Sequence, residues 1–306
     1  MRRFAPHLAL IAVTLIWGTT FSLVKLALRD ASPLAFNLAR MTLAFLVLAT
    51  LNHRELKTVT PRQWAAGALA GLFLALGYQL QTAGLAYTTA TKSAFLTGLV
   101  VVLVPLLCLI PGITPPGQKP PGIASLLGAA VAFCGLILLT TSPGSGFALL
   151  SGMHRGEWLS LACALIYAFH LLTLAHTAGG LSARLLGTLQ IGFAALTMLL
   201  TLPLGGAPHL HLTGAVLLAL AVTALLATAA AFTIQSWAQQ HLPATHTALI
   251  LTLEPIFAWL FALLFLKESL GHRALAGAGC ILLGILLAEL WPTNGQIGSI
   301  LPTAER

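Results

Sequence analysis

Residues 78–96, YQLQTAGLAYTTATKSAFL, and residues 232–250, FTIQSWAQQHLPATHTALI, are two versions of one pattern. At a constant offset of 154 residues, Gln81 in the first stretch corresponds to Gln235 in the second. In both stretches an apolar segment that carries this glutamine ends in a short polar turn, and a new apolar segment then opens with Ala-Thr. Self-similarity at half the chain length indicates a duplicated structural unit.

The composition excludes a water-soluble protein. Of the 306 residues, 58% are hydrophobic and 7% are charged, whereas soluble domains carry about 25% charged residues. The mean hydropathy is +0.94. The net charge of +8 reflects a scarcity of acids, and no basic cluster with interleaved aromatic residues is present. We therefore expect the lipid bilayer as the surroundings and no nucleic-acid partner.

Ten mainly apolar segments are each about as long as a membrane-spanning helix, which takes roughly 20 residues. The expected spans are residues 6–28, 33–51, 63–87, 90–110, 121–140, 156–175, 182–203, 212–239, 244–266 and 274–291. Barrel strands are excluded, because they take about 9–11 residues and alternate polar with apolar side chains. The sequence predicts an all-α membrane protein with ten transmembrane helices.

The duplication divides these helices into two sets of five. Trp17 corresponds to Tyr167 at an offset of 150 residues. We predict two domains, residues 1–150 and residues 151–306, each a repeat of five transmembrane helices, the second with a short C-terminal tail. Because five is odd, the second repeat enters the membrane from the opposite side, so the repeats are inverted. Inverted repeats are typical of secondary transporters, whose binding sites lie between the repeats near mid-membrane.

Charge in the loops favours cytoplasmic termini. With the N-terminus inside, the inner loops and ends hold Arg2, Arg3, Arg54, Lys57, Arg62, Lys119, Arg184 and Arg306, and the outer side holds Lys25, Arg29, Lys92, Arg155, Lys267 and Arg273. This small inner excess agrees with the positive-inside rule.

Several short motifs, in this order and spacing, resemble those of the EamA family of the drug/metabolite transporter (DMT) superfamily. They are Trp17-Gly18-Thr19-Thr20-Phe21 with Lys25, Ser32-Pro33 with Arg40, the stretch ATKSAFL at 90–96, and Leu253-Glu254-Pro255 followed by Lys267-Glu268. The resemblance covers both repeats. It implies a ten-helix permease of the inner (plasma) membrane, with a central cavity walled by helices 1, 3, 4, 6, 8 and 9. It also implies transport of amino acids, other small metabolites or drugs, often outward. The second repeat departs from the pattern at Gln190 and His246, where the first has Arg40 and Lys92, so no charge-pairing role is carried over to those two positions.

Glu254 is the one acid that we expect near the bilayer centre, about ten residues into the ninth span and so roughly 15 Å deep. A carboxylate there is costly unless it is protonated or paired, which makes it a candidate for function. Pro255 follows it and removes a helical hydrogen bond, and Pro105 is the corresponding proline of the first repeat. Two roles stay open: a proton-coupling carboxylate or partner of a substrate amine, and a structural anchor at a helix kink.

Gln81 and Gln235 would lie at mirrored depths in an inverted pair. An amide offers donors and an acceptor without net charge, which suits a polar substrate that binds and then leaves. The alternative is a hydrogen bond between helices, which contributes about 0.6 kcal/mol in membranes.

Aromatic side chains and one histidine complete the candidate cavity. Trp17, Tyr78, Phe95 and Tyr167 would grip an apolar or cationic substrate by packing and cation–π contact; otherwise they are core residues. His170 has a side chain of a type that titrates near neutral pH, and its alternative role is that of a hydrogen-bonded core residue.

Three cationic side chains are expected to have structural or charge-pairing roles. Lys25 would extend to the membrane surface, while Arg40 and Lys92 would pair or bind carbonyl groups; binding a substrate carboxylate is the alternative. Stripes of small residues in the fifth and tenth helices, at 124–132 and 276–284, predict close helix packing within the fold. They also leave open a homodimer through these helices instead of a monomer.

No catalytic or cofactor signature accompanies these features. The sequence lacks a Gly-x-Ser-x-Gly elbow, a His-Glu-x-x-His zinc motif and a Walker sequence, and its four cysteines show no CxxC spacing. We expect no enzyme activity, no metal and no cofactor. The sequence predicts a secondary transporter that exports small polar metabolites, such as amino acids or related amines, by alternating access between the two inverted repeats. A membrane-embedded enzyme, a channel and a non-transporting scaffold are the alternatives.

Overall fold

The structure, a computed structural model, describes residues 4–116, 122–140, 153–177, 181–242, 244–251 and 253–290. Within these residues the regular elements are all helices, apart from one isolated bridge between Ala31 and Leu210. The prediction of an all-α protein is confirmed for the described part of the chain. The expected domain boundary between residues 150 and 151, Lys119 and the C-terminal tail lie outside the described residues, and the side chain of His246 is not described.

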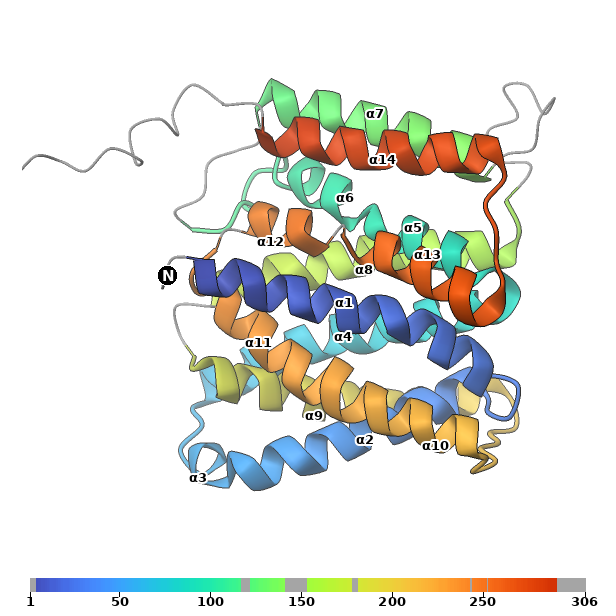
Figure 1. Cartoon of the computed structure of the whole chain (residues 1–306). Coiled ribbons are helices and arrows are strands. Elements are labelled where there is room, and N and C mark those ends of the chain that lie inside the picture. Colours follow the sequence, from blue (N-terminus) through green and yellow to red (C-terminus); the bar gives the residue numbers. More distant parts are fainter. Residues whose placement is uncertain are drawn as a thin grey trace, which may run out of the picture.

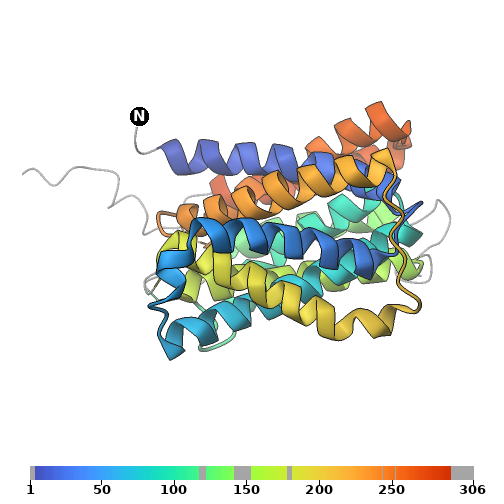
Figure 2. The same cartoon turned by 90° about the horizontal axis from the view of Figure 1, so that it is seen from below.

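The helices run roughly alongside one another, and helices from the two halves of the chain are neighbours (Figure 1). The first half contains α1 (Ala5–Ala27), α2 (Pro33–Leu51), α3 (His53–Leu56), α4 (Pro61–Tyr87), α5 (Ala90–Gly98), α6 (Val100–Leu107) and α7 (Ile123–Thr140). The second half contains α8 (Arg155–Thr177), α9 (Ala183–Thr201), the 3₁₀ helix η2 (Leu202–Gly205), α10 (Gly214–Ala221), the π-helix η3 (Val222–Ala230), α11 (Ala231–Ala238), α12 (Ala244–Leu251), α13 (Leu253–Leu266) and α14 (His272–Leu290). Neighbours from different halves include α1 with α13 and α7 with α14. Figure 2 looks onto α2, α9 and the α10–α11 segment, which lie against one another.

Local sequence explains where several helices begin. The side chains of Thr89, Ser182 and Thr213 each accept a hydrogen bond from a backbone N–H of the first turn of α5, α9 and α10, respectively. Such caps satisfy donors that have no partner inside the helix. Thr60 and Gln63 form a reciprocal capping box at the start of α4. These polar capping residues mark the starts of helices in a chain that is otherwise mainly apolar.

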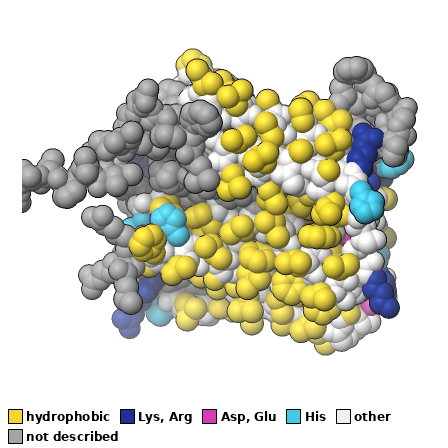
Figure 3. All heavy atoms as spheres, turned by 45° about the horizontal axis from the view of Figure 1, so that its top comes forward, with side chains coloured by type: hydrophobic (Ala, Val, Ile, Leu, Met, Phe, Trp, Pro, Cys, Tyr) yellow, Lys and Arg dark blue, Asp and Glu magenta, His cyan; other side chains and the backbone are white. Residues whose placement is uncertain are grey.

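Helix length and surface character identify a multi-pass membrane protein. Seven helical segments in the described residues are long and apolar enough to cross a bilayer. They are residues 5–27, 33–51, 61–87, 90–107, 155–177, 183–205 and 214–238. Hydrophobic side chains cover the middle of the molecular face seen in Figure 3, while Lys, Arg and His side chains lie toward its two ends. This is the distribution that a bilayer requires.

Two of the expected spans depart from a continuous α-helix within the described residues. The expected helix 90–110 is α5 followed by α6, and 212–239 contains the π-helix η3 between two α-helices. Position 252, between α12 and α13 in the expected span 244–266, lies outside the described residues. The first break lies at Leu99, six positions before Pro105, which lies inside α6. Gly98, which precedes Leu99, is a weak helix former. The proline therefore does not mark the break in the first half as we expected.

The α7 and α14 helices pack along each other at one side of the molecule (Figure 1). Their small residues permit this contact. A Cβ atom on Gly135 would lie 2.5 Å from the carbonyl oxygen of Gly277, and one on Gly284 would overlap the carbonyl of Gly128. The small-residue stripes noted in the sequence thus face each other within one chain, where backbones approach closely.

Candidate functional site

The span 90–107 of the first half and the span 244–266 of the second half meet at Gly98 and Pro255, next to the break at Leu99. Gly98, the last residue of α5, lies against Pro255 at the start of α13, and a Cβ atom on Gly98 would lie 2.7 Å from Cγ of the proline ring. Beyond the crossing, α5 packs against α13 and α6 packs against α12. The residues around Gly98 and Pro255 therefore lie together in the interior.

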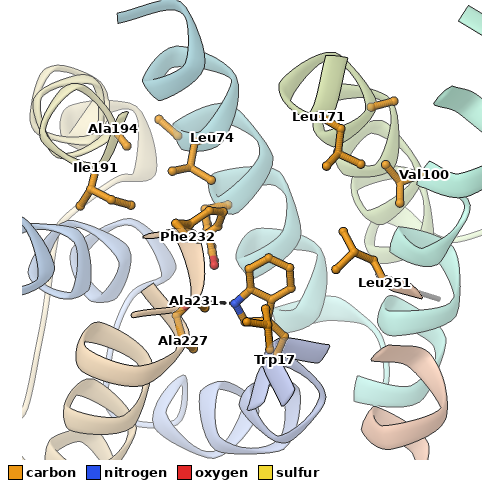
Figure 4. Packing of buried hydrophobic residues seen from close by; sticks show 14 of the residues in the cluster. Trp17, Leu74, Val100, Leu171, Ile191, Ala194, Ala227, Ala231, Phe232 and Leu251 are labelled. Atoms are coloured by element: carbon orange, nitrogen blue, oxygen red, sulfur yellow. Dashed lines mark hydrogen bonds between the residues drawn. The ribbon is translucent and has the colours of Figure 1, made fainter. Parts of the chain in front are cut away.

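A cavity of about 580 Å³, counting the space that opens to the outside, adjoins this crossing. Its lining comes from both halves of the chain: Trp17, Thr20, Tyr78, Gln81, Thr97, Gly98, Val100, Tyr167, His170, Leu171, Phe232, Gln235, Leu251 and Glu254. Figure 4 shows Trp17, Val100, Leu171, Phe232 and Leu251 around this space. Seven of the eight sequence-predicted cavity residues are in this lining, and the eighth, Phe95, is buried in the core (1% exposed) and is not.

Glu254 brings a carboxylate to the cavity wall. It is the second described residue of α13 and directly precedes Pro255. Among the described residues it has no ion pair and no hydrogen-bond partner for its side chain, and the ion pair between Lys92 and Glu157 does not involve it. Glu254 lies in the expected span 244–266, of which the structure describes residues 244–251 and 253–266 as helical.

Gln235 adds a second acceptor. Its side chain is 2% exposed, it lines the cavity, and its Oε1 is buried with no hydrogen-bond partner among the described residues. Its repeat-related counterpart Gln81 lines the same cavity. A buried amide oxygen without a donor is costly. A ligand that donates a hydrogen bond in the cavity would remove this cost.

Arg40 and Asn37 hold Tyr78, an aromatic residue of the cavity lining, through contacts outside the cavity. Arg40, 2% exposed, donates from Nη2 to the Tyr78 hydroxyl and from Nε to Thr228 Oγ1, both at 2.8 Å. Its guanidinium carbon lies 4.2 Å from the centroid of the Tyr78 ring. Asn37 donates to the Tyr78 carbonyl at 3.0 Å and accepts a hydrogen bond from Thr82. These contacts hold the ring in one orientation, and Arg40 does not line the cavity.

Gln190, which corresponds to Arg40 in the repeat, is uncharged and forms hydrogen bonds to His170 and Ser236 of the second half. Its Oε1 lies 2.8 Å from Nε2 of His170, and its Nε2 donates to Ser236 Oγ at 3.1 Å. Because an amide oxygen only accepts, the His170 nitrogen is the donor. His170 is therefore both part of the cavity wall and a hydrogen-bonded residue of the interior.

Aromatic rings form much of the remaining wall. Trp17 donates from Nε1 to the Ala227 carbonyl in the π-helix at 2.7 Å and lies 5.2 Å from the Phe232 ring. Tyr78 meets Tyr167 edge to face at 5.8 Å between ring centroids. Such edge-to-face pairs are favourable and fix ring orientation.

The other predicted cations lie at one end of the molecule, around the turn between α4 and α5. Lys25 donates from Nζ to the carbonyls of Leu85 and Thr88 at 2.6 and 2.7 Å, and Lys92 lies 3.4 Å from Glu157. Neither lysine lines the cavity.

Sequence reasoning did not single out Gly98, Asn37 or Thr97. A signal existed for Asn37, since it is an amide in a strongly apolar segment of helix α2. Gly98 has no glycine counterpart at the offset of the repeat, where Thr252 stands. Its role depends on its contact with Pro255, which is 157 residues away in the sequence.

Comparison with known proteins identifies the family. The model of the EamA-like transporter family matches residues 5–141 and again residues 154–290. An uncharacterized transporter of Archaeoglobus fulgidus is 32% identical over 291 residues, covering 95% of this chain and 87% of that one. A second uncharacterized transporter of the same organism is 27% identical, covering 92% of this chain and 96% of that one. A solved crystal structure with 17% identity has the same fold, with a TM-score of 0.70 over 94% of this chain and 96% of the other. The chain belongs to the EamA-like transporter family and is a multi-pass membrane transporter.

Proposed function

We propose that this transporter is a secondary carrier that exports small polar metabolites bearing an amine, such as amino acids or related amines. The substrate would bind in the central cavity, and two inverted repeats of five helices would open that cavity alternately to the two sides of the membrane. The proposal includes ten transmembrane helices, an inner (plasma) membrane location and cytoplasmic termini.

Contacts between loops support the inversion. The turn after α1 binds the turn before α10: Ser32 N–H donates to the His209 carbonyl and His211 N–H to the Asp30 carbonyl, both at 2.9 Å. At the other end, the Ser182 hydroxyl before α9 donates to Glu55 in α3 at 2.6 Å. The connection between the first and second long helices of each half therefore adjoins the connection between the second and third long helices of the other half. This holds at both ends of the molecule. Repeats running in the same sense would place each connection beside its own counterpart.

The chemistry of the cavity supports an amine as the recognised group. Glu254 and Gln235 supply acceptors without partners among the described residues. The donors of Trp17 and His170 are already used within the protein. A protonated amine is a donor with a positive charge, which the carboxylate and the aromatic faces both favour. The carboxylate of Glu254, which lines the cavity without a partner among the described residues, is the observation that carries the proposal.

The small-residue stripes of α7 and α14 are occupied by contact between these two helices within one chain. This supports a monomer as the transporting unit, with a homodimer through the same helices as the alternative. A cross-linking experiment on the detergent-solubilised protein distinguishes the two states.

Binding and flux measurements test the function. The purified protein is screened by thermal shift against amino acids, nucleosides and amines, because a ligand that binds only the folded form raises the melting temperature. Flux of each hit is then measured in proteoliposomes. For an amine hit we expect Glu254→Gln to reduce the thermal shift and flux by about tenfold or more, the scale of one charge-assisted hydrogen bond.

Glu55→Gln is the matched control, because Glu55 is an acid at one end of the molecule that binds Ser182 and lies outside the cavity. It should retain both binding and flux. Amine flux unchanged by Glu254→Gln would remove the carboxylate from the mechanism. Thermal shifts from anionic solutes alone would remove the amine from the proposal.

A further inference from the structure

The far ends of α5 and α13 are joined by one carboxylate. Glu268, in the loop after α13, accepts hydrogen bonds from the backbone N–H groups of Ala90 and Thr91, both at 3.0 Å, and from the Thr91 hydroxyl at 2.8 Å. Lys267, which precedes it, has a left-handed backbone conformation with φ of 55°. Such a conformation is strained for a residue with a side chain. This strained conformation occurs where the chain turns so that Glu268 contacts the start of α5.

A second carboxylate holds the same turn from another helix. Glu157, near the start of α8 and 4% exposed, accepts hydrogen bonds from the Thr88 hydroxyl at 3.0 Å and from Lys92 at 3.4 Å. The backbone of α8 lies close to the turn, since a Cβ atom on Gly156 would lie 2.8 Å from the Thr88 nitrogen. The turn of the first half is therefore held by two acids of the second half.

The helices between this turn and the cavity are closely packed. We define the end cluster as a group of buried apolar residues from α1, α2, α4, α5, α10, α13 and the first connection, consisting of Phe21, Val24, Ala27, Ala31, Phe36, Leu85, Ala90, Ala94, Val216, Ala219, Leu220, Ala258 and Ala262. In α5, which is about 13 Å long, all residues except Lys92 are buried. α1 meets α13 closely, since a Cβ atom on Gly18 would lie 2.5 Å from the Phe257 Cβ atom. The end cluster thus separates the cavity from this end of the molecule.

The corresponding turn of the second half, between α11 and α12, has weaker contacts. Gln239 donates to the Leu171 carbonyl at 3.2 Å and Gln240 to the Leu181 carbonyl at 2.9 Å. Among the described residues, no carboxylate contacts this turn. Hydrogen bonds to a charged group are roughly twice as strong as neutral ones. The α4–α5 turn is therefore held more strongly than the α11–α12 turn.

We propose that Glu268 and Glu157 form a latch that closes the α4–α5 end of the cavity and must release before a solute passes there. α5 and α13 both run from the crossing at Gly98 and Pro255 to the latch, so releasing Glu268 frees their far ends to separate. Glu268 and Glu157 act through the helices that they hold, and they are positioning residues for transport. The inference rests on the proposed function as a carrier.

Chemical accessibility tests the latch without a substrate. Ala94, 1% exposed, lies in the end cluster between the latch and the cavity. The four native cysteines are replaced by alanine, and Ala94→Cys is introduced as a reporter in the full chain, reconstituted in nanodiscs. The rate at which a membrane-impermeant thiol reagent modifies the introduced thiol measures how often this end opens. Glu268→Gln should raise that rate by about tenfold or more, and Thr91→Val, which removes one of the three donors, by about threefold.

Glu55→Gln, at the opposite end, is the control and should leave the rate unchanged. An unchanged rate in both Glu268→Gln and Thr91→Val would overturn the latch. If Glu268→Gln does not fold, as judged by its melting curve, Thr91→Val decides alone, because it keeps the carboxylate and both backbone donors. The result is independent of the substrate screen, so failure of the proposed function and failure of the latch are distinguishable.

Discussion

The close contact between Gly98 and Pro255 predicts a sharp penalty for the smallest enlargement of Gly98. In Gly98→Ala the new methyl group would lie 2.7 Å from Cγ and 3.7 Å from Cδ of Pro255. Carbon atoms separated by 2.7 Å overlap strongly, and the proline ring has little freedom to move away. Either α5 or α13 must shift, and Glu254 moves with α13.

The expected cost follows from two opposing contributions. Overpacking of an interior by one methyl group costs about 1–3 kcal/mol. Replacing glycine by alanine in a helix contributes about 1 kcal/mol in the other direction. Gly279→Ala in α14 is the matched control, because a Cβ atom at Gly279 has no neighbour within 4 Å. The difference between the two variants isolates the packing cost, about 1–3 kcal/mol.

The free energy of unfolding is measured for both variants by denaturant titration in mixed micelles. We expect Gly279→Ala to be slightly more stable than the parent protein, and Gly98→Ala to be less stable than Gly279→Ala by the packing cost. Gly98→Ala should also reduce the thermal shift caused by a substrate, since Glu254 is displaced. Equal stability of the two variants, with substrate binding intact, would refute the close crossing at Pro255.

Two further variants test the supports of the cavity and of the loop after α13. Arg40→Lys keeps the charge but loses the planar group that binds Tyr78 and Thr228, so the free energy of unfolding should fall by about 2 kcal/mol; an unchanged denaturation midpoint would contradict this. Lys267→Gly relieves the left-handed conformation and should raise the free energy of unfolding by about 1 kcal/mol, whereas a lower melting temperature would show that the lysine side chain stabilises the loop.

Much of the fold could be predicted from the sequence because a bilayer imposes strong constraints. Helices that cross lipid need long apolar segments, and these are visible in the sequence without further information. The duplication added a second constraint. It pointed to Gln81 with Gln235 and to Trp17 with Tyr167, and all four residues line one cavity. The number of spans and the inversion of the repeats stay predictions.

The details of the site could not be predicted, because they depend on contacts between distant residues. The break at Leu99 lies where Gly98 meets Pro255, and neither residue indicates this contact locally. Phe95 has the residue type and depth expected of a cavity wall, but rotation about the α5 axis places it in the core. The acid that binds Thr91 is 177 positions away.

The most direct test of the account is the sidedness of the two halves. Phe4 precedes α1 and His154 precedes α8, and both side chains are exposed. In a background without native cysteines, Phe4→Cys and His154→Cys are introduced separately and treated with an impermeant maleimide in intact cells. Inverted repeats predict that only one of the two positions, the one before α8, is labelled from outside. Labelling of both positions, or protection of both until the membrane is permeabilised, would show that the halves run in the same sense and would contradict a carrier built from inverted repeats.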